Sequence, residues 1–233
     1  MGKRAVNFRV FHIAKLLDID ASFMYDKSMK IKSRVRTLAI PNELRQALQN
    51  NGTVTTAQAN AFSVSNEHLR LLVKKGELER AAFGIYILPD ELADEMYIAQ
   101  LQRPKIIYSH ETALYLHGLT DRDPVNYSVT VPTGYNAAGL RDDDFTVFTI
   151  KRELHEIGMT RQKTIFGNTV TAYGLERTVC DCLRSRNKMD IAVVIDAVKR
   201  YARRKDKNLN TLMDMAEIFQ VTKPLRSYME VLL

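Results

Sequence analysis

Residues 42–89 contain a helix start or stop signal at almost every junction, and this segment constrains the fold more than any other part of the chain. Pro41 precedes the first helical pattern, and Gly52 can end that helix because glycine adopts the left-handed conformation without strain. Thr55 and Gln58 have the spacing of a capping box, in which each side chain bonds the other residue's backbone N–H. A second short helix is therefore predicted to start there.

A third helix is predicted between Ser65, a favourable N-cap, and Gly76, which follows Lys74 and Lys75. The apolar residues of this helix recur at helical spacing and form the stripe that we expect to be buried: Leu69, Leu72 and Val73. The opposite face carries polar side chains four residues apart: Asn66, Arg70 and Lys74. Such a face can contact bases and phosphates, but it is also typical of any solvated helix.

After the third helix, residues Glu77–Arg80 and Ile85–Leu88 read as two short strands around Phe83-Gly84, and Pro89 ends the second. Three helices followed by a hairpin give the order of a winged helix-turn-helix, whose third helix enters the DNA major groove. The expected partner is double-stranded DNA. The residues predicted to contact it lie on the third helix, its ends and the wing: Ser65, Asn66, His68, Arg70, Lys74, Lys75 and Arg80.

The positive charge is distributed unevenly along the chain, which has a formal net charge of +7. Residues 1–90 carry 14 Lys/Arg and 8 Asp/Glu, whereas residues 91–233 carry 20 and 19. Nearly all the excess therefore lies in the part with the DNA-binding pattern, as expected for a protein that neutralises phosphates.

The first 40 residues form an N-terminal extension with two features. Phe11, Ala14 and Leu17 indicate a short helix, and Lys27–Arg36 holds five cations without an acid. The basic segment is either an arm that tracks phosphates or a solvated connector. Met29, which precedes a lysine-rich stretch, is a candidate for an alternative start of translation, and the sequence leaves this open.

Composition favours a soluble cytoplasmic protein of two domains. No apolar run approaches the roughly 20 residues that span a membrane, and the N-terminus lacks the features of a signal peptide. The chain has two cysteines, Cys180 and Cys182, which are expected to be free thiols and do not make a zinc site at this spacing.

Residues 91–233 show a mixed pattern that predicts an α+β domain after the extension (1–40) and the winged helix (41–90). Strands are expected near 106–108, 127–131, 145–150, 163–166 and 169–173, the last two joined by Gly167-Asn168. Helices are expected near 96–101, from Ser109 to Leu116, and at 175–186, 191–203, 209–219 and 224–232, the last four packed over the sheet. Residues 136–144 are expected to be a long loop.

The second domain contains little that predicts catalysis, and we expect no enzyme activity, metal or cofactor. His110-Glu111 begins like a zinc-protease helix, but position 114 is leucine. The acids Asp142–Asp144 would need a well-placed lysine to hold magnesium in a nuclease, and Lys151 is not convincingly spaced. A solvated loop is the favoured interpretation, with a magnesium-dependent nucleic-acid enzyme as the less favoured alternative.

A basic cluster at the end of the 191–203 helix contains six cations, opposed in the sequence by Asp206: Lys199, Arg200, Arg203, Arg204, Lys205 and Lys207. Cations at a helix C-terminus are favoured by the helix dipole, which explains the cluster without any function. The alternative is a docking face for an acidic partner or nucleic acid.

Several motifs across both domains, taken in order, resemble the AbiEi antitoxins of bacterial abortive-infection systems. They are Gly84–Pro89, Tyr108–Leu114, His117–Leu119, Val129–Pro132, Gly167-Asn168 and Leu175–Asp181. The resemblance covers roughly residues 45–233 and leaves residues 1–40 outside. It transfers no catalytic residue to this chain.

The resemblance implies a function for each domain. The DNA-binding domain would repress the promoter of its own operon, at repeated sites, and the C-terminal domain would counter a nucleotidyltransferase toxin, with or without binding it. The system would be of type IV and would stop growth of phage-infected cells. A transcription regulator whose C-terminal domain senses a ligand is the main alternative.

Overall fold

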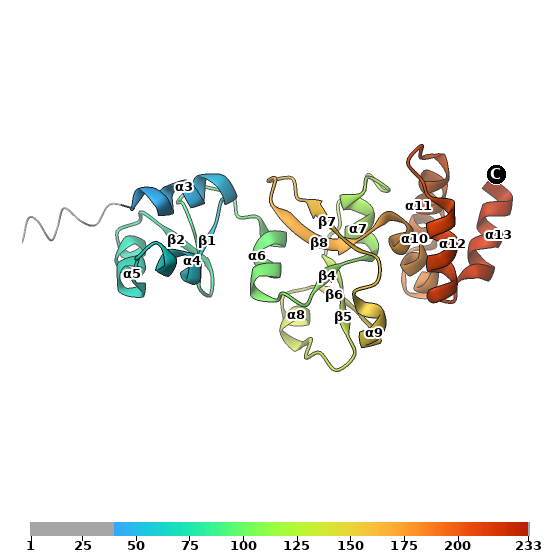
Figure 1. Cartoon of the computed structure of the whole chain (residues 1–233), viewed down its shortest axis with the longest axis horizontal. Coiled ribbons are helices and arrows are strands. Elements are labelled where there is room, and N and C mark those ends of the chain that lie inside the picture. Colours follow the sequence, from blue (N-terminus) through green and yellow to red (C-terminus); the bar gives the residue numbers. More distant parts are fainter. Residues whose placement is uncertain (1–39, 233) are drawn as a thin grey trace, which may run out of the picture. The chain divides into compact units, whose positions relative to one another are not determined.

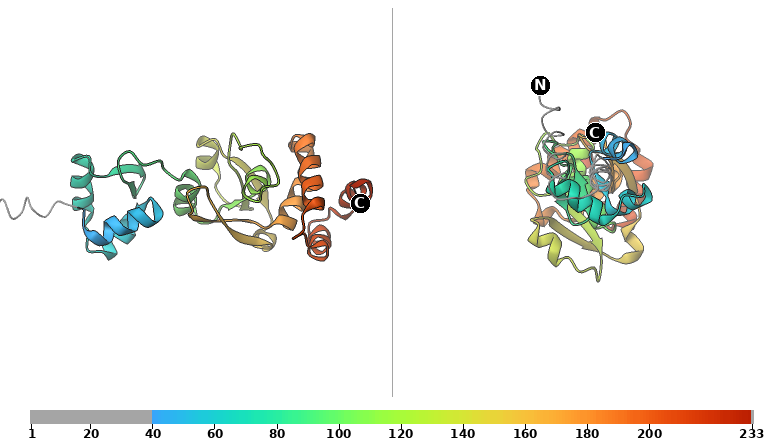
Figure 2. Two further views of the ribbon diagram at one scale, coloured as in Figure 1. Left: turned by 90° about the horizontal axis from the view of Figure 1, so that it is seen from above. Right: turned by 90° about the vertical axis from the view of Figure 1, so that its left-hand side faces the viewer.

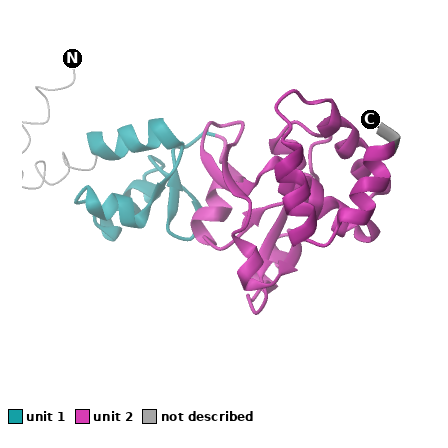
Figure 3. Cartoon of the chain, turned by 45° about the vertical axis from the view of Figure 1, so that its right-hand side comes forward, with its two compact units in different colours: residues 1–91 teal, residues 92–233 magenta. Residues whose placement is uncertain are grey.

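The computed structural model describes residues 40–232. The chain divides between Glu91 and Leu92 into two compact units, called unit 1 and unit 2 (Figure 3). The expected domain boundary after residue 90 lies one residue from this division. The predicted N-terminal helix and the basic segment Lys27–Arg36 lie outside the described residues. Within residues 40–232, no helix is both long and apolar enough to cross a membrane.

Unit 1 has the predicted order of three helices and a hairpin, with one additional strand (Figure 1). Its elements are α3 (Asn42–Asn51), β1 (Val54–Thr55), α4 (Thr56–Ala61), α5 (Asn66–Lys74), β2 (Glu79–Ala82) and β3 (Ile85–Ile87). The strand that the sequence analysis missed is β1, which pairs antiparallel with β3 and gives the sheet order β1-β3-β2. The hairpin is tied to the helices through this pairing.

Local signals explain the helix ends of unit 1. Gly52 ends α3 with a φ of 65°, and its N–H bonds the Leu48 carbonyl. The Thr55–Gln58 capping box is present at α4, and the Ser65 side chain caps α5. The predicted apolar stripes meet in one core, where Leu44, Leu48, Leu69 and Leu72 are fully buried. Each buried leucine stabilises the unit by about 1.5–3 kcal/mol.

Unit 2 is the predicted α+β domain, with a five-stranded mixed sheet followed by a group of helices. Its first part contains α6 (Glu95–Gln102), β4 (Ile107–Tyr108), α7 (His110–Leu116), β5 (Ser128–Pro132), α8 (Ala138–Asp142), β6 (Thr146–Ile150), α9 (Arg152–His155), β7 (Met159–Lys163) and β8 (Thr169–Tyr173). The second part contains α10 (Leu175–Arg184), η1 (Arg186–Lys188), α11 (Ile191–Arg203), α12 (Leu209–Ile218) and α13 (Thr222–Leu232). The sheet order is β6-β5-β4-β8-β7, so β6 and β7 are its edges.

The last helices do not pack over the sheet as expected. Instead α10–α13 lie beside the sheet, as Figures 1 and 2 show, and they enclose a core to which α7 contributes Leu114. Ile150, at the end of β6, is the one strand residue of that core among the residues described. A separate core lies between the strands and helices α6 and α8.

The predicted strand at 163–166 was wrong, because the strand is β7 at Met159–Lys163 and residues 164–168 form the turn. The reason is a buried carboxylate far away in sequence. Asp94 accepts a hydrogen bond from the Thr164 hydroxyl (2.6 Å) and another from the Asn168 side-chain amide (2.9 Å). These two bonds hold a five-residue turn at residues 164–168, whereas the sequence predicted a two-residue turn at Gly167-Asn168.

Two further predictions in unit 2 needed correction. The expected loop at residues 136–144 contains α8, which Leu140 anchors in the sheet core. Ser109 precedes α7 but does not cap it through its side chain. Its hydroxyl bonds Thr130 and His110 instead.

Candidate nucleic-acid interface

Helix α5 is the element that the winged helix-turn-helix pattern assigns to the major groove. The Ser65 hydroxyl accepts a hydrogen bond from the His68 N–H at 3.2 Å and so starts the helix. Leu69 and Leu72 fix its inner face in the core. The turn before α5 is held by buried Val64 and by Ser63, which has a φ of 60°. This helix is therefore positioned from both its start and its inner face.

The outer face of α5 presents the predicted side chains to solvent. Asn66, Arg70 and Lys74 are all exposed, as is Lys75 at the C-terminal end of the helix. Arg70 lies 3.8 Å from Glu67, with 80% of the Arg70 side chain and 72% of the Glu67 side chain exposed. An exposed pair of this kind contributes little to stability. The guanidinium can therefore leave Glu67 for a base or a phosphate at small cost.

His68 differs from the other residues predicted on this helix. It is half-buried, and its Nε2 atom is enclosed without a hydrogen-bond partner. In this conformation Nε2 is not available to a base edge. The remaining members of the predicted set are the ones that the structure exposes.

The wing adds a cation and an aromatic ring. Arg80 is exposed on β2, its Nε donates to the Ala82 carbonyl at 3.3 Å, and its guanidinium lies 5.1 Å from the centre of the Phe83 ring. Phe83 itself is 85% exposed at the tip of the hairpin. The sequence pattern indicated only a turn position for Phe83. The missed signal is an aromatic residue in place of the small polar residues usual in tight turns.

The net positive charge of the winged helix is smaller than the comparison of residues 1–90 with residues 91–233 implied. Residues 42–89 hold 5 Lys/Arg and 4 Asp/Glu, whereas residues 1–39 hold 9 and 3. The excess positive charge of the first 90 residues therefore belongs to the extension, which lies outside the described residues. The interface of unit 1 depends on where its few cations lie, namely on α5 and the wing.

The basic cluster at the end of α11 is largely neutralised by acids that its sequence neighbourhood does not reveal. Arg200 binds both Asp121 and Asp196, and Arg204 pairs with Asp206. The expectation that Asp206 alone opposes the cluster was wrong, because Asp121 comes from a distant loop and Asp196 from one turn earlier. Lys207 donates to the Ala202 carbonyl at 2.6 Å. Exposed cations remain at Lys199, Arg203 and Lys205.

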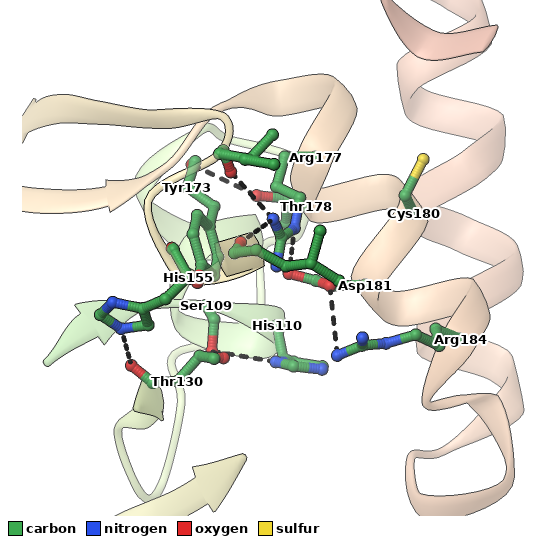
Figure 4. A network of polar contacts seen from close by, with 12 residues as sticks. Ser109, His110, Thr130, His155, Tyr173, Arg177, Thr178, Cys180, Asp181 and Arg184 are labelled. Atoms are coloured by element: carbon green, nitrogen blue, oxygen red, sulfur yellow. Dashed lines mark hydrogen bonds and ion pairs between the residues drawn. The ribbon is translucent and has the colours of Figure 1, made fainter. Parts of the chain in front are cut away.

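Unit 2 contains a buried ion pair on α10 that the sequence analysis did not identify (Figure 4). Arg177 Nε donates to Asp181 Oδ2 at 2.9 Å, and both side chains are almost fully buried. The guanidinium also lies between the rings of Tyr173 and Phe219. Burial raises the pKa of Asp181, and the charge of Arg177 opposes that rise. The i,i+4 spacing was the available signal.

His110 belongs to the same network and begins α7 with a φ of 49°. One ring nitrogen lies 2.9 Å from the Ser109 hydroxyl and the other 2.9 Å from the Ser185 hydroxyl, while the ring stacks on Phe148. Burial, together with the positive charges of Arg184 and Arg177, lowers the pKa of His110 well below its usual value. His110 is therefore a neutral, internally hydrogen-bonded residue in unit 2.

Three other residues considered for chemistry occupy structural positions. Asp143, from the acidic run, pairs with Arg103. Cys180 and Cys182 are free and buried, and burial raises the pKa of Cys180 to about 12. No group of three His, Cys, Asp or Glu side chains that could hold a metal occurs in the part of the chain that the structure describes.

Comparison with known proteins supports the interpretation of unit 1. Among solved structures, the RV2827C protein from Mycobacterium tuberculosis is similar, with a TM-score of 0.52 and 13% identity over 83% of this chain and 82% of that one. At this identity the similarity concerns the fold alone. No curated protein matches the chain. The segment that forms the winged helix, residues 42–89, matches the family model described as "Transcriptional regulator, AbiEi antitoxin". The similarity to AbiEi antitoxin transcriptional regulators is therefore carried by residues 42–89, the winged helix of unit 1.

Proposed function

We propose that the chain is the antitoxin of an abortive-infection system and represses its own operon. In this proposal α5 enters the major groove of repeated promoter sites, and the wing contacts the flanking backbone. The observation that carries the proposal is a capped, core-anchored helix whose outer face exposes Asn66, Arg70 and Lys74, within the residues that match the family. Asparagine and arginine can read adenine and guanine, and lysine contacts phosphate.

The second part of the proposal assigns the antitoxin role to unit 2. There, exposed cations on α11 or other surfaces would meet the cognate nucleotidyltransferase toxin or its RNA substrate. The support is the match of residues 42–89 to the antitoxin family model, together with a unit 2 that has its own cores. Type IV behaviour, in which no tight stoichiometric complex is needed, comes with the resemblance of the motifs in both units.

A test in cells can separate the two roles. Arg70→Ala in the full chain should abolish repression of a promoter–reporter fusion, while rescue from the induced toxin gene remains, because Arg70 lies on the outer face of unit 1. The matched control is Arg45→Ala, an exposed arginine on α3, which should keep both activities. Loss of rescue by a folded Arg70→Ala protein would contradict the division of roles.

The proposal gives the chain no enzymatic step. Asp142→Asn and Asp144→Asn should leave every activity of the chain unchanged, because these exposed acids lie at and just after the end of α8, outside any group of three potential metal ligands among the described residues. A magnesium-dependent cleavage of nucleic acid that disappears in these variants would overturn this part of the proposal.

A further inference from the structure

We propose that unit 2 binds a phosphorylated small molecule of nucleotide size in a cavity beside the end of α10. This proposal goes beyond DNA binding and toxin antagonism and does not depend on them. The cavity has a volume of about 380 Å³, within the usual range of small-molecule sites. Its lining includes Thr149, Lys151, Leu154, Arg184 and Ile218.

The charge of the lining favours an anion. Lys151 and Arg184 line the cavity, and its lining contains no acid. Within residues 40–232, neither side chain makes a hydrogen bond, and the one charged contact of Arg184 is Asp181 Oδ1 at 3.7 Å. That separation exceeds hydrogen-bond distance. Donors on both cations are therefore available to a ligand.

Two arginines near the end of α11 differ from Lys151 and Arg184, because acids bind them closely. Arg200 is bound by two aspartates, and Arg204 is bound by Asp206 and the His117 carbonyl. Lys151 and Arg184 have no such hydrogen-bonded acid among the described residues, and both line the same cavity.

The network behind the cavity supports a net positive charge there. Asp181 is fully buried and already accepts the hydrogen bond of Arg177, so it compensates one of two guanidinium groups (Figure 4). Asp181 Oδ1 has no hydrogen-bond partner. The pKa of His110 is lowered well below its usual value by burial and by the charges of Arg184 and Arg177, so His110 adds no charge. One positive charge of the Arg177–Asp181–Arg184 group thus remains for a ligand in the cavity.

The rest of the lining suits a phosphorylated organic molecule. Thr149 is exposed on the edge strand β6 and can donate to a phosphate oxygen, while arginine can bind phosphate through two parallel hydrogen bonds. Ile218, which is 41% exposed, and Leu154 provide an apolar wall on which a base or sugar can lie. A bare phosphate would leave this wall uncovered.

The test is isothermal titration calorimetry of the full chain with ATP, and separately with inorganic phosphate, in magnesium-free buffer at roughly physiological salt. We expect saturable binding of ATP that Lys151→Glu weakens about tenfold or more, because the substitution places an acid against the phosphate. Lys163→Glu is the matched control, since Lys163 is an exposed lysine on β7, the opposite edge of the sheet. It should bind ATP like the unmodified protein.

Arg184→Gln provides a second variant and should also weaken ATP binding, provided that its circular dichroism and melting show a folded protein. Binding of both ATP and phosphate, each weakened by Lys151→Glu, would support the site and identify the phosphate group as the shared feature. Binding of ATP alone would support a nucleotide. Equal ATP affinity in the Lys151→Glu and Lys163→Glu variants, or no binding of either probe, would overturn the proposal. A Lys151→Glu substitution that weakens binding of an oligonucleotide but not of ATP or phosphate would also overturn it.

Discussion

Thr56 holds the wing to the second helix of unit 1 through two hydrogen bonds to one atom, the Gly84 carbonyl oxygen. The Thr56 N–H donates at 2.8 Å and its hydroxyl at 3.1 Å. Gly84 has a φ of 70°, and a Cβ atom built on it would lie 3.2 Å from the Thr56 hydroxyl oxygen. The start of α4 and the turn of the hairpin therefore form one rigid joint, which sets the direction of Arg80 and Phe83.

Thr56→Val should loosen this joint. Valine keeps the shape and the backbone N–H but removes the hydroxyl, so we expect a loss of about 1 kcal/mol in the unfolding free energy of unit 1. DNA affinity should fall severalfold, since the wing loses a fixed position. Urea unfolding and fluorescence anisotropy measure the two effects. A control, Thr169→Val at the exposed first residue of β8 in unit 2, should change neither. Unchanged affinity in Thr56→Val would mean that the wing does not contribute to binding.

Glu67→Gln should strengthen DNA binding. The change removes the carboxylate 3.8 Å from Arg70 and frees the guanidinium, and it also removes a negative charge from a face that meets phosphates. We expect a gain of roughly two- to fivefold at physiological salt, with little change in stability because exposed ion pairs contribute little. Glu79→Gln, an exposed acid on β2, controls for net charge. An affinity reduced by Glu67→Gln would show that Glu67 itself contacts the DNA.

Arg177→Met should destabilise unit 2 severely. It leaves the Asp181 carboxylate buried without its main partner, and breaking a buried pair from one side costs about 3–5 kcal/mol. The double substitution Arg177→Met with Asp181→Leu should recover much of that loss, because no charge remains buried. Urea unfolding of both variants measures the difference. A double variant no more stable than Arg177→Met would contradict the electrostatic explanation.

The stability of unit 2 should decrease as the pH falls below about 6.5, the ordinary pKa of histidine. Burial lowers the pKa values of His110, His117 and His155 in the folded protein. The unfolded chain therefore takes up protons first, and the stability present above pH 6.5 is lost on acidification. Each histidine contributes a slope of at most about 1.4 kcal/mol per pH unit.

Urea unfolding at pH 7.5, 6.5 and 5.5 checks this dependence. His117→Gln should make it shallower, since His117 is half-buried and its substitution removes one of the three groups. A stability that rises between pH 7.5 and 5.5 would contradict the assignment of neutral histidines.

Local signals account for the parts of the fold that were predicted correctly. Gly52, the Thr55–Gln58 box and Ser65 act within three or four residues, so spacing alone identifies them. The errors have distant causes. The turn at residues 164–168 depends on Asp94, and the neutralisation of Arg200 depends on Asp121. No local pattern contains either partner.

The candidate interface likewise has one part that the sequence predicts and another that depends on distant contacts. Helical periodicity was enough to place Asn66, Arg70 and Lys74 on the outer face of α5. It could not show that His68 Nε2 is enclosed, or that Thr56 fixes the wing, because both depend on packing between elements. The Lys151–Arg184 cavity joins a strand end to a helix end that is more than 30 residues away in sequence.

The central claim is that α5 reads DNA at the promoter of the chain's own operon. The most direct test is a footprint of the purified full chain on the DNA upstream of its gene, at roughly physiological salt with competitor DNA, beside Arg70→Ala. We predict protection of discrete, repeated sites by the unmodified protein and at least about tenfold weaker protection by Arg70→Ala. Diffuse binding that disappears with salt, or equal protection by both proteins, would contradict the account.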